Sequence, residues 1–324
     1  MTQNYTGREN PWRGVSAHRD GESENFSTLF LPTAESEREG EVSRQRVLDT
    51  IAQLGLQTHV GELERDGYTV LRPTEVGSPD FITQLRDTVL KLSEKRTGIR
   101  VNIETGETHR SLSSPFGQVQ FESCLLEEDP IFERMLMHER TLALVTYLLG
   151  ESCVLNHFSS MIKGPGHEHL PLHTDQNQSG GPPPFPPYAQ IANATWILTD
   201  YTVENGCLCF VPGSHKSCRA PTREEAMDLS RFVPLEAPAG SVVIWHGNTW
   251  HGALRRTKPG VRVSLLAYFT RWYITPIEEL HSRVTQEMLE RNPPRFAILT
   301  GARKPVSHES DTVHSLAART SLFA

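Results

Sequence analysis

The pattern of hydrophobic and polar positions changes near residue 150. Before that point, apolar residues recur three and four positions apart, which is the spacing of one face of an α-helix. Ser78 and Pro79 suit the start of one such helix, and Gly150 suits the end of another that covers 130–149. We therefore predict a helical scaffold over 41–150. The apolar positions of its first helices are Val47, Leu48, Ile51, Leu54, Phe81, Leu85 and Val89.

From Cys153 onward the pattern changes to short β-prone runs separated by glycine- and proline-rich turns. Such spacing predicts an antiparallel sandwich or barrel over 151–275, within a single domain of 41–302. The runs are VLNHFSSMI, ANATWILTDYT, CLCFVPG, GSVVIWHG and VRVSLLAYFTRWYI.

The two ends and one loop lack this patterning. Residues 1–40 are polar without apolar periodicity and are expected to form a flexible arm, and the polar tail 303–324 is expected to be loosely held. The segment QSGGPPPFPPYAQ contains too many prolines for a central strand. We expect it to form a semi-rigid loop directly after LPLHTDQ.

Charge and cysteine content narrow the class of protein. A formal charge of -7 and a pI near 6.1 argue against a nucleic-acid or anionic-membrane binder and favour a small-molecule partner. Neither a secretory signal nor an apolar run of roughly 20 residues is present, which favours a cytoplasmic protein; oligomeric state stays open. The five cysteines show no CxxC spacing, so free thiols are expected.

His173 and Asp175 lie two positions apart, so a strand would point both side chains the same way. Two histidines and one carboxylate on one face are typical of a mononuclear iron(II) that activates oxygen. The third ligand would come from AGSVVIWHGNTWHG, which offers His246 and His251. The alternative is that the pair is two polar residues at the end of a strand.

Arg262 helps to choose between these histidines. Iron-bound 2-oxoglutarate needs a buried cation for its far carboxylate, and a guanidinium matches that group with two parallel bonds. Arg262 follows a turn at 258–260, so a hairpin would set it near the third ligand. With His251 as that ligand, the separation is 262 − 251, or 11 residues.

The ordered combination of HTDQ, TWILTDYTVENGCLCFVPGSHK and AGSVVIWHGNTWHG, with an arginine 11 residues after its histidine, resembles the phytanoyl-CoA dioxygenase family over roughly 60–275. The resemblance implies a double-stranded β-helix (jelly roll, cupin-like) core with flanking N-terminal helices, and the cofactors Fe(II), 2-oxoglutarate and O2. It also implies iron ligands His173, Asp175 and His251, Arg262 on the distal carboxylate, and Trp196 beside the cosubstrate.

The chain departs from the family at Ala253, where many members carry a small hydroxyl residue that assists the arginine. Asn156 and Ser160, on the predicted strand before HTDQ, are candidates to complete the cosubstrate site. The residues expected around the substrate are Phe158, Gln176, Asn177, Phe185, Tyr188 and Trp250.

The implied activity is hydroxylation of an unactivated C–H bond in a small, largely apolar metabolite, with 2-oxoglutarate converted to succinate and CO2. Desaturation, epoxidation and ring formation are alternatives, because substrate placement decides the outcome. A further alternative is a non-catalytic relative that only binds a metabolite. Another is a three-histidine zinc or cupin site formed by His167, His169 and His173. Asp175 argues against a halogenase, which replaces this carboxylate.

Overall fold

The computed structural model describes residues 34–106, 112–114, 117–166, 168–179 and 181–304. The chain divides into a short unit, Met1–Val42, and a large unit, Ser43–Ala324. Helix α1 spans Ala34–Gln53, so it begins before residue 40, the predicted end of the flexible arm. The rest of that arm, and most of the predicted tail, lie outside the described residues.

The helical scaffold predicted before residue 150 contains short helices with clear end signals. Ser78 caps α4, because its hydroxyl accepts a hydrogen bond from the Phe81 amide at 3.2 Å. The stretch predicted as one helix at 130–149 forms two helices, with His138 capping the second. The elements are α2 (Gln57–Asp66), β1 (Tyr68–Leu71), α3 (Pro73–Val76), α4 (Pro79–Thr97), α5 (Pro130–Leu136) and α6 (Glu139–Leu149).

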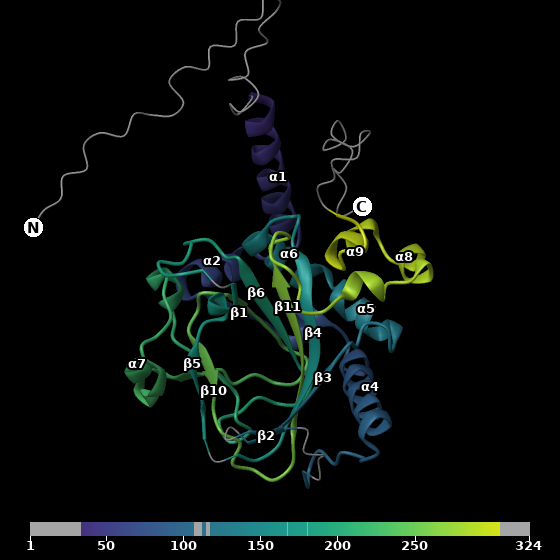
Figure 1. Cartoon of the computed structure of the whole chain (residues 1–324), viewed down its shortest axis with the longest axis vertical. Helices are drawn as coiled ribbons and strands as arrows, with labels where there is room; N and C mark the ends of the chain where they lie inside the picture. The colour runs from purple at the N-terminus through teal and green to yellow at the C-terminus, as the bar shows by residue number, and fades with distance from the viewer. Residues whose placement is uncertain (1–33, 107–111, 115–116, 167, 180, 305–324) are drawn as a thin grey trace, which may run out of the picture. The chain divides into compact units, whose positions relative to one another are not determined.

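The described strands form two antiparallel sheets (Figure 1). The major sheet has the order β1-β9-β6-β11-β4-β3-β2, and the minor sheet has the order β5-β10-β7-β8. Major-sheet strands are β2 (Leu112–Ser114), β3 (Gly117–Ser123), β4 (Val154–Lys163), β6 (Ile191–Ile197), β9 (Val242–His246) and β11 (Arg262–Thr270). Minor-sheet strands are β5 (Leu170–His173), β7 (Leu208–Phe210), β8 (Val233–Pro234) and β10 (His251–Ala253).

Helical segments fill the remaining connections. They are η2 (Asp175–Ser179), η3 (Ser214–Ser217), α7 (Arg223–Met227), η4 (Leu229–Arg231), η5 (Leu280–Ser282), α8 (Gln286–Arg291) and α9 (Pro294–Leu299). No helix in the described part of the chain is long and apolar enough to cross a membrane. All five cysteines are free, as predicted.

The two faces of the major sheet differ, because successive residues of a strand point to opposite sides. One face packs against the helices in the larger apolar core, and we call it the outer face; in β11 it carries Val263, Leu265, Ala267 and Phe269. The opposite, inner face carries Arg262, Ser264, Leu266 and Tyr268.

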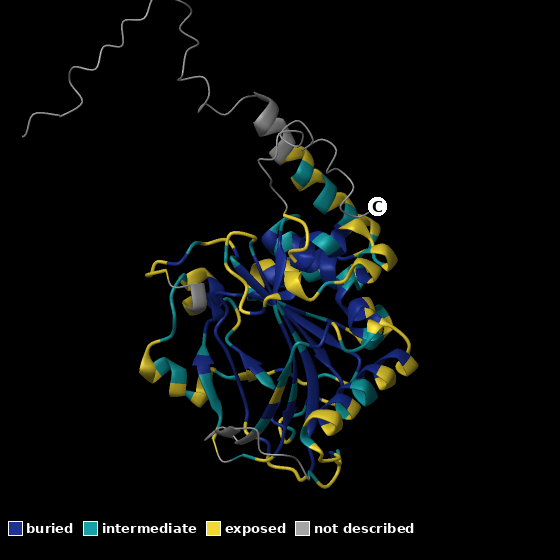
Figure 2. Cartoon of the chain, turned by 45° about the vertical axis from the view of Figure 1, so that its right-hand side comes forward, coloured by how far each residue is buried: buried dark blue, intermediate teal, exposed yellow. Residues whose placement is uncertain are grey.

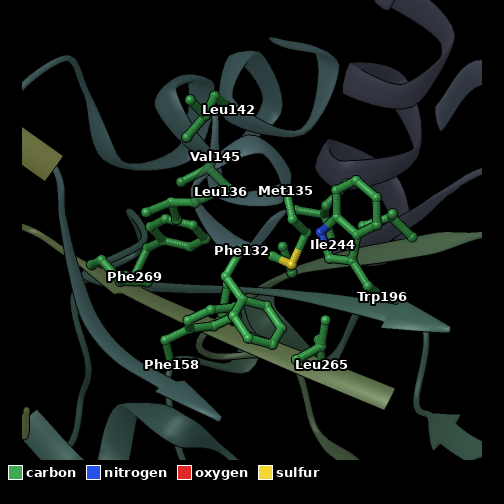
Figure 3. Close-up of a cluster of buried hydrophobic side chains, with 14 of the residues drawn as sticks. Phe132, Met135, Leu136, Leu142, Val145, Phe158, Trp196, Ile244, Leu265 and Phe269 are labelled. Carbon is green, nitrogen blue, oxygen red and sulfur yellow. The ribbon is translucent and has the colours of Figure 1, made fainter. Parts of the chain in front are cut away.

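The outer face is the main apolar core of the protein (Figure 3). Phe158 of β4 packs edge-on against Phe132 of α5, with ring centroids 5.7 Å apart. Trp196 of β6 packs edge-on against Phe81 of α4 at 6.2 Å. Buried aromatic pairs of this kind contribute about 0.5–1.5 kcal/mol beyond the area that they bury.

The inner face of the major sheet meets the minor sheet in a smaller apolar core. Tyr68 of β1 stacks on Phe210 of β7 with centroids 4.4 Å apart, and Trp245 of β9 packs against the same phenylalanine. Figure 2 shows that the central strands of the major sheet are mostly buried, whereas many exposed residues lie on helices and loops. Apolar side chains therefore fill part of the space between the sheets, and the polar residues described next lie beside them.

Candidate metal and cosubstrate site

Three predicted ligands come together between the sheets: His173 at the end of β5, Asp175 at the start of η2, and His251 at the start of β10. Their ligand atoms all lie within 4.8 Å of one another. His173 and His251 are direct cross-strand partners in the β5–β10 pair. Gly252 permits this pairing, because a Cβ at that position would collide with the carbonyl oxygen of Leu170.

Backbone carbonyls orient both imidazole rings. His173 Nδ1 lies 2.9 Å from the Pro171 oxygen, and His251 Nδ1 lies 3.0 Å from the Thr249 oxygen. Each Nδ1 therefore carries the proton, which leaves each Nε2 as the metal-binding nitrogen. Burial lowers the pKa of His251 to about 4, so its ring is neutral, as a ligand must be.

The Asp175 carboxylate is held by two donors from the inner face of the major sheet. Asn193 Nδ2 donates to Oδ2 at 2.7 Å, and Trp245 Nε1 donates to the same oxygen at 3.1 Å. Sequence reasoning did not identify either donor. A usable signal was present, since Asn193 interrupts the apolar run of β6, and a buried carboxamide needs hydrogen-bond partners.

The donor set of two imidazoles and one oriented carboxylate fits a mononuclear iron(II) site. The alternative histidines lie elsewhere. His169 Nδ1 accepts a hydrogen bond from the Arg255 amide, and His246 packs against His215. His167 is outside the described residues. Within the part of the chain that the structure describes, neither His169 nor His246 belongs to the metal-ligand group.

Arg262 is buried on the inner face, with 1% of its surface exposed. It donates to the carbonyl of Gly206, and its guanidinium lies 4.3 Å above the ring of Tyr201. Another of its nitrogens lies 3.5 Å from the sulfur of Met161. Its Nε has no hydrogen-bond partner among the described atoms.

Two buried hydroxyls on the inner face also lack partners among the described atoms: Ser264 Oγ and Thr195 Oγ1. Ser264 follows Arg262 by two residues in β11 and so shares its face. Thr195 of β6 pairs with Leu266, which places it on that face as well. Because buried polar groups are nearly always satisfied in proteins, these hydroxyls and Arg262 Nε suit a polar ligand.

Four other predicted residues lie apart from this cluster, which corrects the expectation. Trp196, Phe158 and Ser160 pair with outer-face residues of β11, so strand alternation points them toward the helices. Asn156 binds the hydroxyl of Thr270 and backbone groups of the segment after β11. Ser160 therefore does not share the inner face with Arg262, and the hydrogen bonds described for Asn156 involve neither Arg262 nor the metal ligands.

The proline-rich loop after Asp175 borders a cavity of about 660 Å³. Gln176 and Phe185 line this cavity, whereas Asn177 and Tyr188 are exposed. Trp250 is not part of the cavity lining, and its indole nitrogen donates to the Arg219 carbonyl. The complete lining is Gln176, Gly181, Pro182, Pro184, Phe185, Pro186, Gln190, Tyr273, Ile274 and Thr275.

A family model described as Phytanoyl-CoA dioxygenase (PhyH) matches residues 63–264, which confirms the family predicted from the motifs. Dioxygenase af480 of Aspergillus fumigatus is 32% identical over 174 residues, covering 53% of this chain and 55% of the relative. Phytanoyl-CoA dioxygenase 1 of Oryza sativa subsp. japonica is 30% identical over 156 residues, covering 44% and 53%. The chain thus spans about half the length of these curated relatives.

Solved structures share the fold. The crystal structure of HygX from Streptomyces hygroscopicus, with nickel and 2-oxoglutarate bound, matches with a TM-score of 0.55 and 18% identity. The match covers 71% of this chain and 92% of that chain. The predicted double-stranded β-helix with flanking N-terminal helices is confirmed.

Proposed function

We propose, since the chain belongs to the phytanoyl-CoA dioxygenase (PhyH) family, that it is an iron(II)- and 2-oxoglutarate-dependent oxygenase. It hydroxylates an unactivated C–H bond of a small, largely apolar metabolite and converts 2-oxoglutarate to succinate and CO2. The observation that carries this proposal is the convergence of His173, Asp175 and His251, whose ligand atoms lie within 4.8 Å of one another. Arg262, on the inner face between the sheets, supplies the cation that the cosubstrate requires.

Iron(II) and 2-oxoglutarate, when bound, supply the oxidising power of the reaction with oxygen. The protein contributes placement. His173 and His251 present Nε2 because backbone carbonyls hold their other nitrogens. Asn193 and Trp245 fix the Asp175 carboxylate, so three ligand groups are oriented before the metal binds.

Arg262 binds the distal carboxylate of 2-oxoglutarate through its unused donors. The Ser264 hydroxyl, which is buried and unpartnered in the described structure, completes this site in place of a hydroxyl at Ala253. The hydroxyl of Thr195, which lies on the same inner face, offers a further hydrogen bond to the cosubstrate. Enclosure between the sheets keeps water away from these contacts and strengthens them.

The cavity beside the proline-rich loop receives the substrate. Its described lining consists of uncharged residues, including Phe185 and several prolines, which suits a neutral and largely apolar molecule. The carboxamides of Gln176 and Gln190, which hydrogen-bond to each other, offer polar contacts for orientation. Because placement decides the product, desaturation, epoxidation or ring formation uses the same site with a different substrate pose.

The proposal is tested by incubating the iron-loaded protein with 2-oxoglutarate and a cell extract, followed by mass spectrometry. We expect succinate formation together with a product heavier by one oxygen atom. A product that has lost two hydrogens would instead support desaturation or ring formation. If the protein forms no succinate with any extract and binds neither iron(II) nor 2-oxoglutarate in titrations, it is not an oxygenase of this class.

A further inference from the structure

A second buried cation lies opposite Arg262. Lys163 is the last residue of β4, and it is the direct cross-strand partner of Arg262, so both side chains occupy the inner face. Lys163 is 3% exposed, and its Nζ donates to the Leu254 carbonyl at 2.7 Å. A buried ammonium is rarely left without an anionic partner, because removing its charge from water is costly.

The charged groups that act on Lys163 in the described structure are cations, Arg262 and Arg256. Within the described structure, neither Lys163, Arg262 nor the nearby Arg256 forms an ion pair with an acidic residue. Burial raises the pKa of the Cys207 and Cys209 thiols to about 11 and about 12, so both are neutral near pH 7. The titratable and charged groups that act on Lys163 are Arg262, Arg256, Cys207, Cys209 and His169.

We propose that Lys163 is a second cation of the distal-carboxylate site, and that its protonated form holds the far carboxylate of the cosubstrate together with Arg262. The inference rests on the proposed 2-oxoglutarate site and deepens it. Two cations facing each other across β4 and β11 repel, and an anion between them removes that repulsion. Arg262 Nε and Ser264 Oγ belong to residues on the same face of β11 and have no hydrogen-bond partner in the described structure, which supports a polar, anionic ligand on this face.

Binding at this site is linked to proton uptake. Burial, followed by the charge of Arg262, lowers the pKa of Lys163 to about 7 in the ligand-free protein. A bound carboxylate raises that pKa again, so ligand binding takes up a proton near and above neutral pH. The affinity for 2-oxoglutarate should therefore fall as pH rises above about 7, by at most about tenfold per pH unit.

The test is calorimetric titration of the nickel-loaded protein, with all the residues of this sequence, with 2-oxoglutarate between pH 6.5 and pH 9, in buffers of different ionisation heat. Wild type should take up a fraction of one proton per ligand bound. Lys163→Met should bind roughly tenfold to hundredfold more weakly at pH 6.5 and take up no proton. Lys163→Arg should bind tightly with a flat pH dependence, because a guanidinium does not titrate in this range.

Two controls isolate the distal carboxylate and the position of the lysine. Titration with 2-oxobutyrate, which lacks the second carboxylate, should show no proton uptake that depends on Lys163. Lys95→Met removes an exposed lysine, which pairs with Glu128, and should leave affinity and proton uptake unchanged. If Lys163→Met fails to fold, the pH dependence of 2-oxoglutarate affinity in Lys163→Arg still tests the proposal.

The outcomes separate this inference from the proposed function. Equal weakening at every pH in Lys163→Met, or a wild-type pH dependence in Lys163→Arg, means that Lys163 only supports the backbone at Leu254, and overturns the inference. In both cases wild-type protein still binds 2-oxoglutarate, so the proposed function stands. Wild-type protein that binds no 2-oxoglutarate at any pH overturns both.

Discussion

The two faces of the major sheet are built from the same strands but have different roles. In β11, the outer-face residue Leu265 packs into the helix-covered core, whereas its neighbour Ser264 has a buried hydroxyl with no partner in the described structure. The outer face stabilises the fold through apolar packing. The inner face carries buried polar groups at a cost in stability, and such groups are expected where a ligand completes their hydrogen bonds.

The largest effect should come from the metal ligands beside the inner face. His173→Ala, Asp175→Ala and His251→Ala should each greatly weaken iron(II) binding and abolish 2-oxoglutarate turnover, because an incomplete set cannot hold or orient the metal. Metal titration and succinate assays measure both effects. His169→Ala is the control and should retain metal. Loss of iron in that variant with retention in His251→Ala would reverse the ligand assignment.

The outer face should respond in stability alone. Phe158→Ala removes a fully buried ring that packs on Phe132, and should lower the free energy of unfolding by about 3–5 kcal/mol. Urea denaturation measures this loss. Metal affinity of the folded variant should stay at the wild-type value, since the side chain points away from the ligands. A folded variant with normal stability and weak metal binding would place Phe158 at the site.

The spacing motifs identified residues that the fold brings together, because His173, Asp175 and His251 form one group. The expected local geometry was wrong: β5 ends at His173, so Asp175 lies in η2 and not on the same strand, and β10 and β11 belong to different sheets, so no hairpin pairs His251 with Arg262. The change from helical to β periodicity near residue 150 agrees with the observed order of helices and strands.

The faces of the central strands could not be predicted in the same way. Most positions of β4 are buried on both sides, so VLNHFSSMIK shows no alternation of polar and apolar residues that would identify a face. Ser160 is therefore only a candidate for the cosubstrate site from the sequence, and register pairs it with the outer-face residue Leu265. The partners of Asp175 come from β6 and β9, and their approach depends on sheet order, which local patterns do not encode.

Arg262→Lys tests whether the buried guanidinium on the inner face binds 2-oxoglutarate. The substitution keeps the charge but loses the paired, planar contact to a carboxylate. Affinity for 2-oxoglutarate should fall by about 1.5–3 kcal/mol, or roughly tenfold to hundredfold, in titrations of nickel-loaded protein. Metal binding should be retained, because Arg262 is not a ligand. Unchanged 2-oxoglutarate affinity would remove Arg262 from the cosubstrate site.

The smallest expected effect gives the most direct comparison, because the two faces offer a matched pair of serines. Ser264 on the inner face and Ser160 on the outer face are each 1% exposed, and neither hydroxyl has a partner in the described structure. Ser264→Ala should weaken 2-oxoglutarate binding by about 0.5–1.5 kcal/mol, the net contribution of one hydrogen bond, while Ser160→Ala should leave it unchanged. Removing an unsatisfied buried hydroxyl should also leave the stability of the ligand-free Ser160 variant unchanged or slightly raised. Equal loss of 2-oxoglutarate affinity in both variants would show that position on a face does not decide which hydroxyl contacts the cosubstrate.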